Sequence, residues 1–201
     1  MAEEEHAEET SQSATWIIDP LDGTVNYLHG SPCYCVSVAL RINGILEAGV
    51  IHAPELGETF HALRGGGAFL NDRKIRVSTS SRLIDSVIAT GFAYRRAETP
   101  HNNVGNFSRL VLKARGVRRM GAAALDLAYV SAGIFDGFWE LFLAPWDVAA
   151  GALLINEAGG QVTDFKGSDD FIFTKNIVAS NGIIHNEIIE NLDTFEPGEN
   201  E

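Results

Sequence analysis

Basic residues are scarce in this sequence. It has 15 Lys and Arg against 27 Asp and Glu, a formal net charge of −12 over 201 residues. A protein that binds nucleic acid or an anionic membrane neutralises phosphate groups with Lys and Arg, and this chain has few to offer. We therefore expect neither kind of partner.

Long apolar runs and cysteines are also missing. Apolar residues make up 45% of the chain, yet no run approaches the roughly 20 residues that cross a bilayer. No signal peptide precedes the first apolar run. The two cysteines, Cys33 and Cys35, are better explained as small buried residues in a reducing compartment than as a disulfide or a metal site. These features favour a cytoplasmic protein.

The pattern of apolar residues changes near residue 86. Before it, β-prone runs alternate with turn residues, and the runs on either side of Asn43-Gly44 predict a hairpin. After it, strand-like runs alternate with segments of helical periodicity. The predicted strands are residues 16–19, 34–40, 45–51, 58–63, 67–70, 86–90, 135–141, 161–165 and 177–180, and the predicted helices are 103–114, 121–132, 146–158 and 185–194.

This order of elements predicts a mixed α/β (α+β) fold. Residues 1–85 would form an antiparallel-sheet half and residues 86–201 an α/β half, the two together making one compact unit.

Two carboxylates follow the first apolar run at a spacing of three residues. In the stretch 16–26, WIIDPLDGTVN, Pro20 prevents the strand from continuing beyond Asp19. A tight turn there could direct Asp19, Asp22 and the Leu21 carbonyl at one point. That is an oxygen set of the kind that Mg²⁺ prefers.

The two residues after these acids suit a phosphate. Gly23 lets the backbone approach a ligand closely, and the amides of Gly23 and Thr24 could face an anion. The alternative is an ordinary surface turn, since Asp-Pro-x-Asp-Gly is good turn chemistry in itself. A buried strand seldom directs two acids into one turn without a group that neutralises them.

Two further acids lie in the second half of the chain. Asp147 stands at the start of an Ala- and Gly-rich helix, where it could be a metal ligand or simply an N-cap. Glu140 ends the predicted strand 135–141 and could be a site residue or a solvated strand-end acid. Arg118-Arg119, just before Gly121, could face an anionic partner or a dimer interface, with solvated surface as the default interpretation. Arg64-Gly-Gly-Gly67 is interpreted as a hairpin turn rather than a phosphate-binding nest.

With these residues in view, the sequence resembles the inositol monophosphatase family. WIIDPLDGTVNY matches the first family signature, Asp-Pro-x-Asp-Gly-Thr-x-Asn-[Phe/Tyr], and WDVAAGALLINEAGG (146–160) matches the second. The stretch GAAALDLAYVSAGIFDGFWE between them is also similar to the family. The resemblance covers the chain from about residue 2 to the last helix.

The resemblance implies a Mg²⁺-dependent, Li⁺-sensitive phosphomonoesterase with a layered αβαβα fold, commonly a homodimer, acting on inositol monophosphate through metal-activated water. It implies Thr24, Asp22 and Asp19 as the catalytic group, with Thr24 orienting the water. The implied metal ligands are Glu3, Asp19, Leu21, Asp22 and Asp147, and the implied substrate-binding residues are Leu21, Asp22, Gly23, Thr24, Gly121, Ala122, Ala123, Glu140 and Asp147.

The chain departs from the family pattern at its start. The family has a pair of helices ahead of a Glu-Glu pair, and here Glu3 matches the first Glu of that pair best, with Glu4 and Glu5 as alternatives. The resemblance therefore predicts a fold without its N-terminal helices, with exposed apolar faces and weak or absent activity. A fructose-1,6-bisphosphatase or dual-specificity sugar phosphatase is the alternative activity. A shortened, non-catalytic protein that binds transcription machinery is the alternative of another class.

Overall fold

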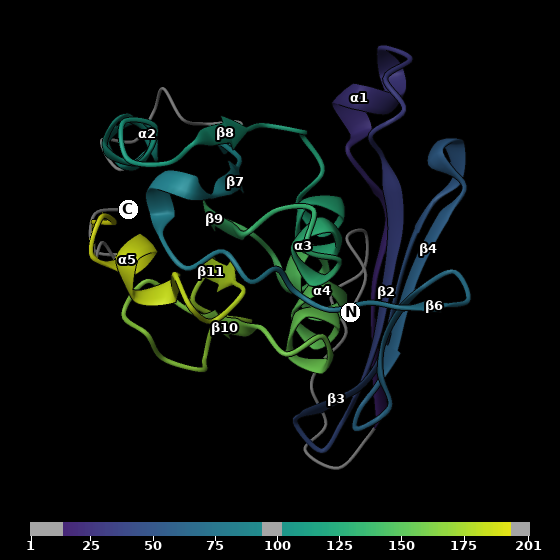
Figure 1. The fold of residues 1–201 in the computed structure, drawn as a ribbon. Helices are drawn as coiled ribbons and strands as arrows, with labels where there is room; N and C mark the ends of the chain where they lie inside the picture. Colours follow the sequence, from purple (N-terminus) through teal and green to yellow (C-terminus); the bar gives the residue numbers. More distant parts are fainter. Residues whose placement is uncertain (1–13, 94–101, 194–201) are drawn as a thin grey trace.

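The computed structural model describes residues 14–93 and 102–193, and in this part of the chain the strands form two sheets (Figure 1). The first sheet has six antiparallel strands that follow chain order. They are β1 (Ala14–Asp22), β2 (Cys35–Ile42), β3 (Ile45–Ala53), β4 (Glu58–Leu63), β5 (Gly67–Leu70) and β6 (Arg73–Lys74). The predicted hairpin is confirmed: Asn43 and Gly44 join β2 to β3 with φ of 51° and 82°, the left-handed backbone that a two-residue hairpin turn requires.

The second sheet is mixed and follows the order β10-β11-β9-β7-β8. Strand β7 pairs parallel with both β8 and β9, and the other pairs are antiparallel. The bounds are β7 Val87–Thr90, β8 Gly116–Arg118, β9 Gly137–Leu141, β10 Gln161–Thr163 and β11 Asn176–Ser180. This mixture confirms the predicted α/β class.

Five α-helices accompany these strands in the described residues: α1 Thr24–Leu28, α2 Val104–Leu110, α3 Ala123–Ser131, α4 Pro145–Glu157 and α5 His185–Ile189. Two 3₁₀ turns lie at Pro54–Leu56 and Leu83–Asp85. Helices α3 and α4 lie between the two sheets, and α2 and α5 lie on the far side of the second sheet (Figure 1). No helix in this part of the chain is long and apolar enough to cross a membrane.

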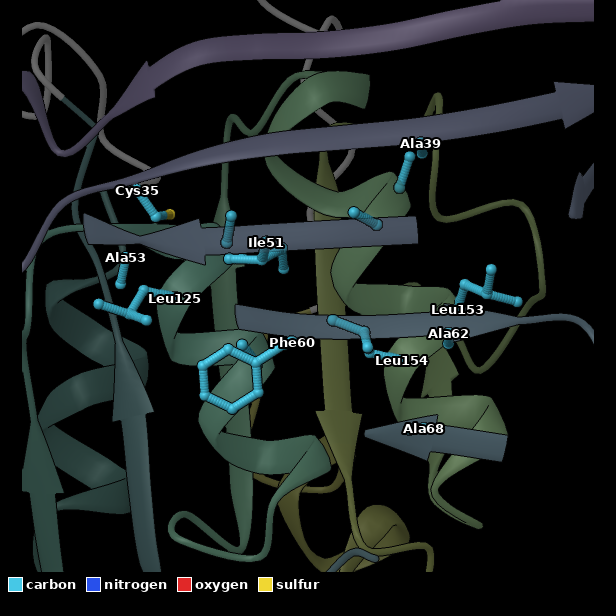
Figure 2. Packing of buried hydrophobic residues seen from close by; sticks show 14 of the residues in the cluster. Cys35, Ala39, Ile51, Ala53, Phe60, Ala62, Ala68, Leu125, Leu153 and Leu154 are labelled. Atoms are coloured by element: carbon cyan, nitrogen blue, oxygen red, sulfur yellow. The ribbon is translucent and has the colours of Figure 1, made fainter. Parts of the chain in front are cut away.

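Three buried apolar clusters hold these layers together. The first joins the six-stranded sheet to α3 and α4, with Phe60 and Ile51 facing Leu125 and Leu154 (Figure 2). The second joins the same two helices to the second sheet, and the third joins that sheet to α2 and α5. Eight of the nine residues of α3 and eight of the 13 residues of α4 are buried, because each helix contacts a sheet on both sides.

The opposite face of the six-stranded sheet keeps apolar side chains at its surface. Trp16, Val50 and Leu63 are 55%, 39% and 66% exposed. Cross-strand register places Trp16, Leu40, Ala48 and Leu63 in one row across this face. This face of the sheet is therefore partly apolar in the described part of the chain.

Several predicted boundaries were wrong. The first strand does not stop at Asp19 but continues to Asp22, and α1, β6 and β8 were not predicted. In the described residues β1 pairs only with β2 and is therefore an edge strand of its sheet. An edge strand tolerates Pro20, because no second neighbouring strand requires the backbone N–H that proline lacks. The missed elements are only two to five residues long, too short for periodicity to reveal.

Candidate active site

A β-bulge in β1 brings the first two acids to the same side of the sheet. Residues three apart in a regular strand point to opposite faces. Here Asp19 pairs with Ser37 and Asp22 with Cys35, so two residues of β1 lie opposite a single residue of β2. This extra residue, beside Pro20, shifts the alternation by one position and turns Asp22 to the face that Asp19 already occupies.

Local hydrogen bonds fix the turn that follows. The Leu21 amide donates to Asp19 Oδ1 at 2.9 Å, and the Thr24 hydroxyl donates to the Leu21 carbonyl at 3.1 Å. Gly23 has φ of 85°, and a Cβ there would lie 2.8 Å from the Cys33 carbonyl oxygen. Glycine is thus required by the turn itself.

Helix α4 supplies the third acid from its first turn. Pro145 is the first helical residue, so Asp147 lies in the first turn, where its Oδ2 accepts the Ala144 amide at 2.7 Å. The N-cap residue is Ala144, so the N-cap interpretation of Asp147 was wrong. The Ser37 hydroxyl donates to the Trp146 carbonyl at 3.1 Å and ties this helix start to β2.

Helix α3 meets Asp22 with its N-terminal end. The Ala124 amide donates to Asp22 Oδ2 at 2.8 Å, and the Cys35 thiol lies 3.7 Å from the same oxygen. One carboxylate oxygen from each of Asp19, Asp22 and Asp147 lies within 4.8 Å of the other two. The structure therefore brings together residues from β1 and α4 that lie far apart in the chain.

This oxygen set fits a hard divalent cation. Ligand oxygens lie about 2.0–2.1 Å from Mg²⁺ and about 2.3–2.6 Å from Ca²⁺, so two ligands of one ion are at most about 4.2 Å or about 5.2 Å apart. The oxygens of the three carboxylates lie within 4.8 Å of one another, a separation of this order, and they carry the negative charge that such an ion neutralises.

The three acids line one pocket together with the other predicted site residues in the described part of the chain. Leu21, Gly23, Thr24, Gly121, Ala122, Ala123 and Glu140 all border it. Glu3, and the alternatives Glu4 and Glu5, lie outside the described residues.

Glu140 is buried in the wall of this pocket. It is 8% exposed, so its interpretation as a solvated strand-end acid was wrong. Burial, followed by the nearby charges of Asp147 and Asp22, raises the pKa of Glu140 to about 8, and Arg119 opposes that rise. Burial and the charges of Asp147 and Asp19 likewise raise the pKa of Asp22 to about 7. A bound cation would stabilise the charged forms of these acids.

Sequence reasoning missed several residues of the pocket lining, and three of them bear on its chemistry. Arg119 lines it and is not merely solvated surface. Asp126 lines it as well and is 1% exposed, and its Oδ1 has no hydrogen-bond partner. Burial first, then the charge of Glu140, raises the pKa of Asp126. Gly91 is the third, and only the fold shows that the β7 end faces this pocket.

The Arg64-Gly-Gly-Gly67 turn was correctly predicted as a hairpin connection, here between β4 and β5. Its amides nevertheless bind an anion from the chain itself. Gly65 and Gly67 donate to the two carboxylate oxygens of Glu157 at 2.7 and 2.8 Å. This contact anchors the C-terminal end of α4, the helix that carries Asp147.

Comparison with known proteins agrees with this geometry. The model of the inositol monophosphatase family matches residues 1–195. The chain belongs to the inositol monophosphatase family. The chain is 47% identical over 175 residues to an "Inositol-1-monophosphatase" of Mesorhizobium japonicum, and the match covers 87% of this chain and 66% of that protein. It is also 49% identical over 168 residues to a "Nus factor SuhB" of Pseudomonas aeruginosa, covering 83% and 62% of the two chains.

A solved family structure shares the fold. The inositol monophosphatase from Anabaena (Nostoc) sp. superposes with a TM-score of 0.92 at 47% identity, covering 95% of this chain and 76% of that one. The predicted family and fold are thereby confirmed. The chain spans about two thirds of the length of the first curated relatives it matches.

Proposed function

We propose that this chain is a Mg²⁺-dependent phosphomonoesterase that hydrolyses inositol monophosphate. The observation that carries the proposal is the cluster of Asp19, Asp22 and Asp147 in a pocket bordered by Thr24 and Glu140. Membership of the inositol monophosphatase family gives this cluster its chemical context.

The metal chemistry belongs to the acid cluster. We assign Asp19, Asp22, Asp147 and the Leu21 carbonyl as Mg²⁺ ligands, with Glu3 as a further ligand from the segment before β1. Bound Mg²⁺ would supply Lewis-acid polarisation of a phosphoryl oxygen and of water, and would neutralise charge on the phosphate.

The protein groups position the reactants. The Gly23 and Thr24 amides lie at the start of α1, where helical N–H groups have no intrahelical acceptor, and we assign them to the phosphate. Because the Thr24 hydroxyl donates its proton to the Leu21 carbonyl, its lone pairs can accept a hydrogen bond from the attacking water. Thr24 would therefore orient the water for in-line attack without acting as a covalent nucleophile.

A further part of the pocket lining would hold the alcohol part of the substrate. Gly121, Ala122 and Ala123 border the pocket at the start of α3, and Glu140 borders it from β9. We assign these residues to the inositol ring, with the Glu140 carboxylate accepting hydrogen bonds from ring hydroxyls.

The test is phosphate release from inositol 1-phosphate by the full chain, with MgCl₂ and with EDTA. We expect Mg²⁺-dependent release, lowered at least about 100-fold in Asp147→Asn through the loss of a charged ligand. Asp164→Asn is the matched control, because Asp164 is a buried aspartate outside the pocket lining. Release that is independent of Mg²⁺, or unaffected by Asp147→Asn, would contradict the proposal.

The same assay compares possible substrates and tests the family properties. We expect faster turnover of inositol 1-phosphate than of fructose 1,6-bisphosphate; the reverse order would indicate a sugar bisphosphatase. We also infer inhibition by Li⁺ and a homodimer. Activity unchanged by LiCl, or a monomer by light scattering, would refute those two inferences.

A second candidate function is a binding role in transcription. The name "Nus factor SuhB" of the Pseudomonas aeruginosa relative favours it. A folded chain that binds Mg²⁺ by calorimetry but releases no phosphate would support this role over the enzymatic one.

A further inference from the structure

We propose that Asn103 is a positioning residue that holds the Glu140 carboxylate in the pocket wall. It would do so through Gly91 on one side of Glu140 and Trp139 on the other. The inference rests on the proposed function, in which Glu140 binds the ring hydroxyls of the substrate.

The Asn103 side chain is buried and fully hydrogen-bonded. It is 4% exposed, and its Nδ2 donates to the Gly91 carbonyl at 2.7 Å and to Thr90 Oγ1 at 2.9 Å. Its Oδ1 accepts from Trp139 Nε1 at 2.8 Å and from Asn106 Nδ2 at 3.2 Å. A side-chain amide has two N–H groups and two lone pairs, and all four are used here.

These bonds join the two strands that flank the pocket wall. Thr90 is the last residue of β7 and pairs with Trp139 of β9, to whose carbonyl its hydroxyl donates at 2.6 Å. Trp139 directly precedes Glu140. The side-chain amide of Asn103 thus fixes both the strand that carries Glu140 and the backbone carbonyl of Gly91.

Gly91 is in direct contact with the Glu140 carboxylate. A Cβ on Gly91 would lie 2.2 Å from both carboxylate oxygens, so the carboxylate fills the space that any larger residue would need. The backbone at Gly91 does not have a positive φ, so alanine is compatible with its conformation. Any effect of Gly91→Ala should therefore come from displacement of Glu140.

The Asn103 side chain is itself held in place by Asn106 of α2. Asn103 has φ of 67° and precedes α2. Asn106 Oδ1 accepts from Arg109 at 2.6 Å and from the Asp193 amide at 2.9 Å while its Nδ2 donates to Asn103. The position of the Gly91 carbonyl is therefore set by a network that reaches the last described residue.

The experiment compares two phosphate esters. Inositol 1-phosphate has ring hydroxyls for Glu140, whereas the alcohol part of p-nitrophenyl phosphate has none. We expect Asn103→Ala and Gly91→Ala to raise KM for inositol 1-phosphate about tenfold or more. The loss in kcat/KM should be clearly smaller for p-nitrophenyl phosphate than for inositol 1-phosphate, because its alcohol part offers Glu140 no hydroxyl groups.

The matched control is Asn181→Ala. Asn181 is also 4% exposed and makes four hydrogen bonds, but it follows β11 at the Gly137 end of the neighbouring strand, away from Glu140. It should leave the ratio of the two KM values unchanged. The indole ¹H–¹⁵N signal of Trp139 should shift in Asn103→Ala and not in Asn181→Ala.

The outcomes distinguish the positioning role of Asn103 from the proposed enzymatic function. Equal losses on both esters, or the same KM ratio in Asn181→Ala as in Asn103→Ala, would overturn the positioning role. If Asn103→Ala does not fold, Gly91→Ala decides the question alone by the KM ratio. A wild-type chain that hydrolyses neither ester overturns the proposed function, and the positioning role is then judged by weakened calorimetric binding of inositol 1-phosphate in Gly91→Ala.

Discussion

If the acid cluster binds Mg²⁺ as proposed, the protonation of Asp22 should make that binding depend on pH near neutrality. Burial, with the charges of Asp147 and Asp19, raises the pKa of Asp22 from 3.8 to about 7. Mg²⁺ binds the charged carboxylate, so the proton must leave when the ion arrives. The affinity should therefore rise as the pH rises, and the ion should release a proton at the lower end of the range.

The size of the effect follows from that pKa. With a pKa of about 7, about one tenth of the Asp22 carboxyls are charged at about pH 6 and about nine tenths at about pH 8. The apparent Mg²⁺ affinity should thus increase about tenfold over this interval. A carboxyl with its ordinary pKa is charged throughout and would give no change.

The same shift has a consequence for stability. The folded chain keeps a proton on Asp22 that the unfolded chain loses near its ordinary pKa. Without Mg²⁺, this group therefore lowers stability progressively as the pH rises from about 4 through about 7. Mg²⁺ should raise the melting temperature more at about pH 8 than at about pH 6, because it binds the charged form.

Isothermal titration calorimetry in two buffers of different ionisation enthalpy measures both affinity and proton release. We expect Asp22 to release nearly one proton per bound ion at about pH 6 and close to none at about pH 8. Asp22→Asn should weaken binding and reduce the release at about pH 6, whereas Asp164→Asn should leave both unchanged. A wild-type affinity that stays constant over this interval, without proton release, would refute the argument from burial and like charge.

Three further predictions concern stability. Glu157→Gln should lower the free energy of unfolding in urea by about 1–2 kcal/mol, because the amide of glutamine cannot accept hydrogen bonds from both turn N–H groups. The control Glu190→Gln, at an exposed position, should change it by less than about 0.5 kcal/mol. Equal effects of the two substitutions would exclude the anchoring role of Glu157. Burial lowers the pKa of His185 from 6.5 to about 4, so the unfolded chain takes up this proton first as the pH falls. The free energy of unfolding should therefore drop by up to about 3 kcal/mol between about pH 6.5 and 4. In urea titrations, His185→Gln should make the free energy of unfolding depend less on pH over this interval. An unchanged pH dependence would show that another group is responsible. Burial raises the pKa of Asp126, so the free-energy cost of keeping this side chain in the folded protein grows as the pH rises. Asp126→Asn should therefore stabilise the fold by roughly 1 kcal/mol or more at about pH 8 and by less at about pH 5. Destabilisation by Asp126→Asn at about pH 8 would contradict this account.

The three acids that cluster in the pocket could be picked out from the sequence because their signals are local. Asp19, Asp22 and Asp147 each stand in a short signature in which the neighbouring residues are also informative. The same holds for the hairpin at Asn43-Gly44, whose backbone preference is a property of the two residues themselves. Helix α4 was predicted from its composition and from Gly159-Gly160 beyond its end.

The sequence by itself determined which acids this protein offers and which kinds of element carry them. Only the tertiary structure decided that Asp19 and Asp22 share a face, because a bulge shows itself in the pairing of two strands and not in either strand alone. It likewise decided that Glu140 is buried against Gly91. Burial and contact depend on what other segments bring to the same place, and a carboxylate on an exposed strand end has the same sequence as one in a pocket wall.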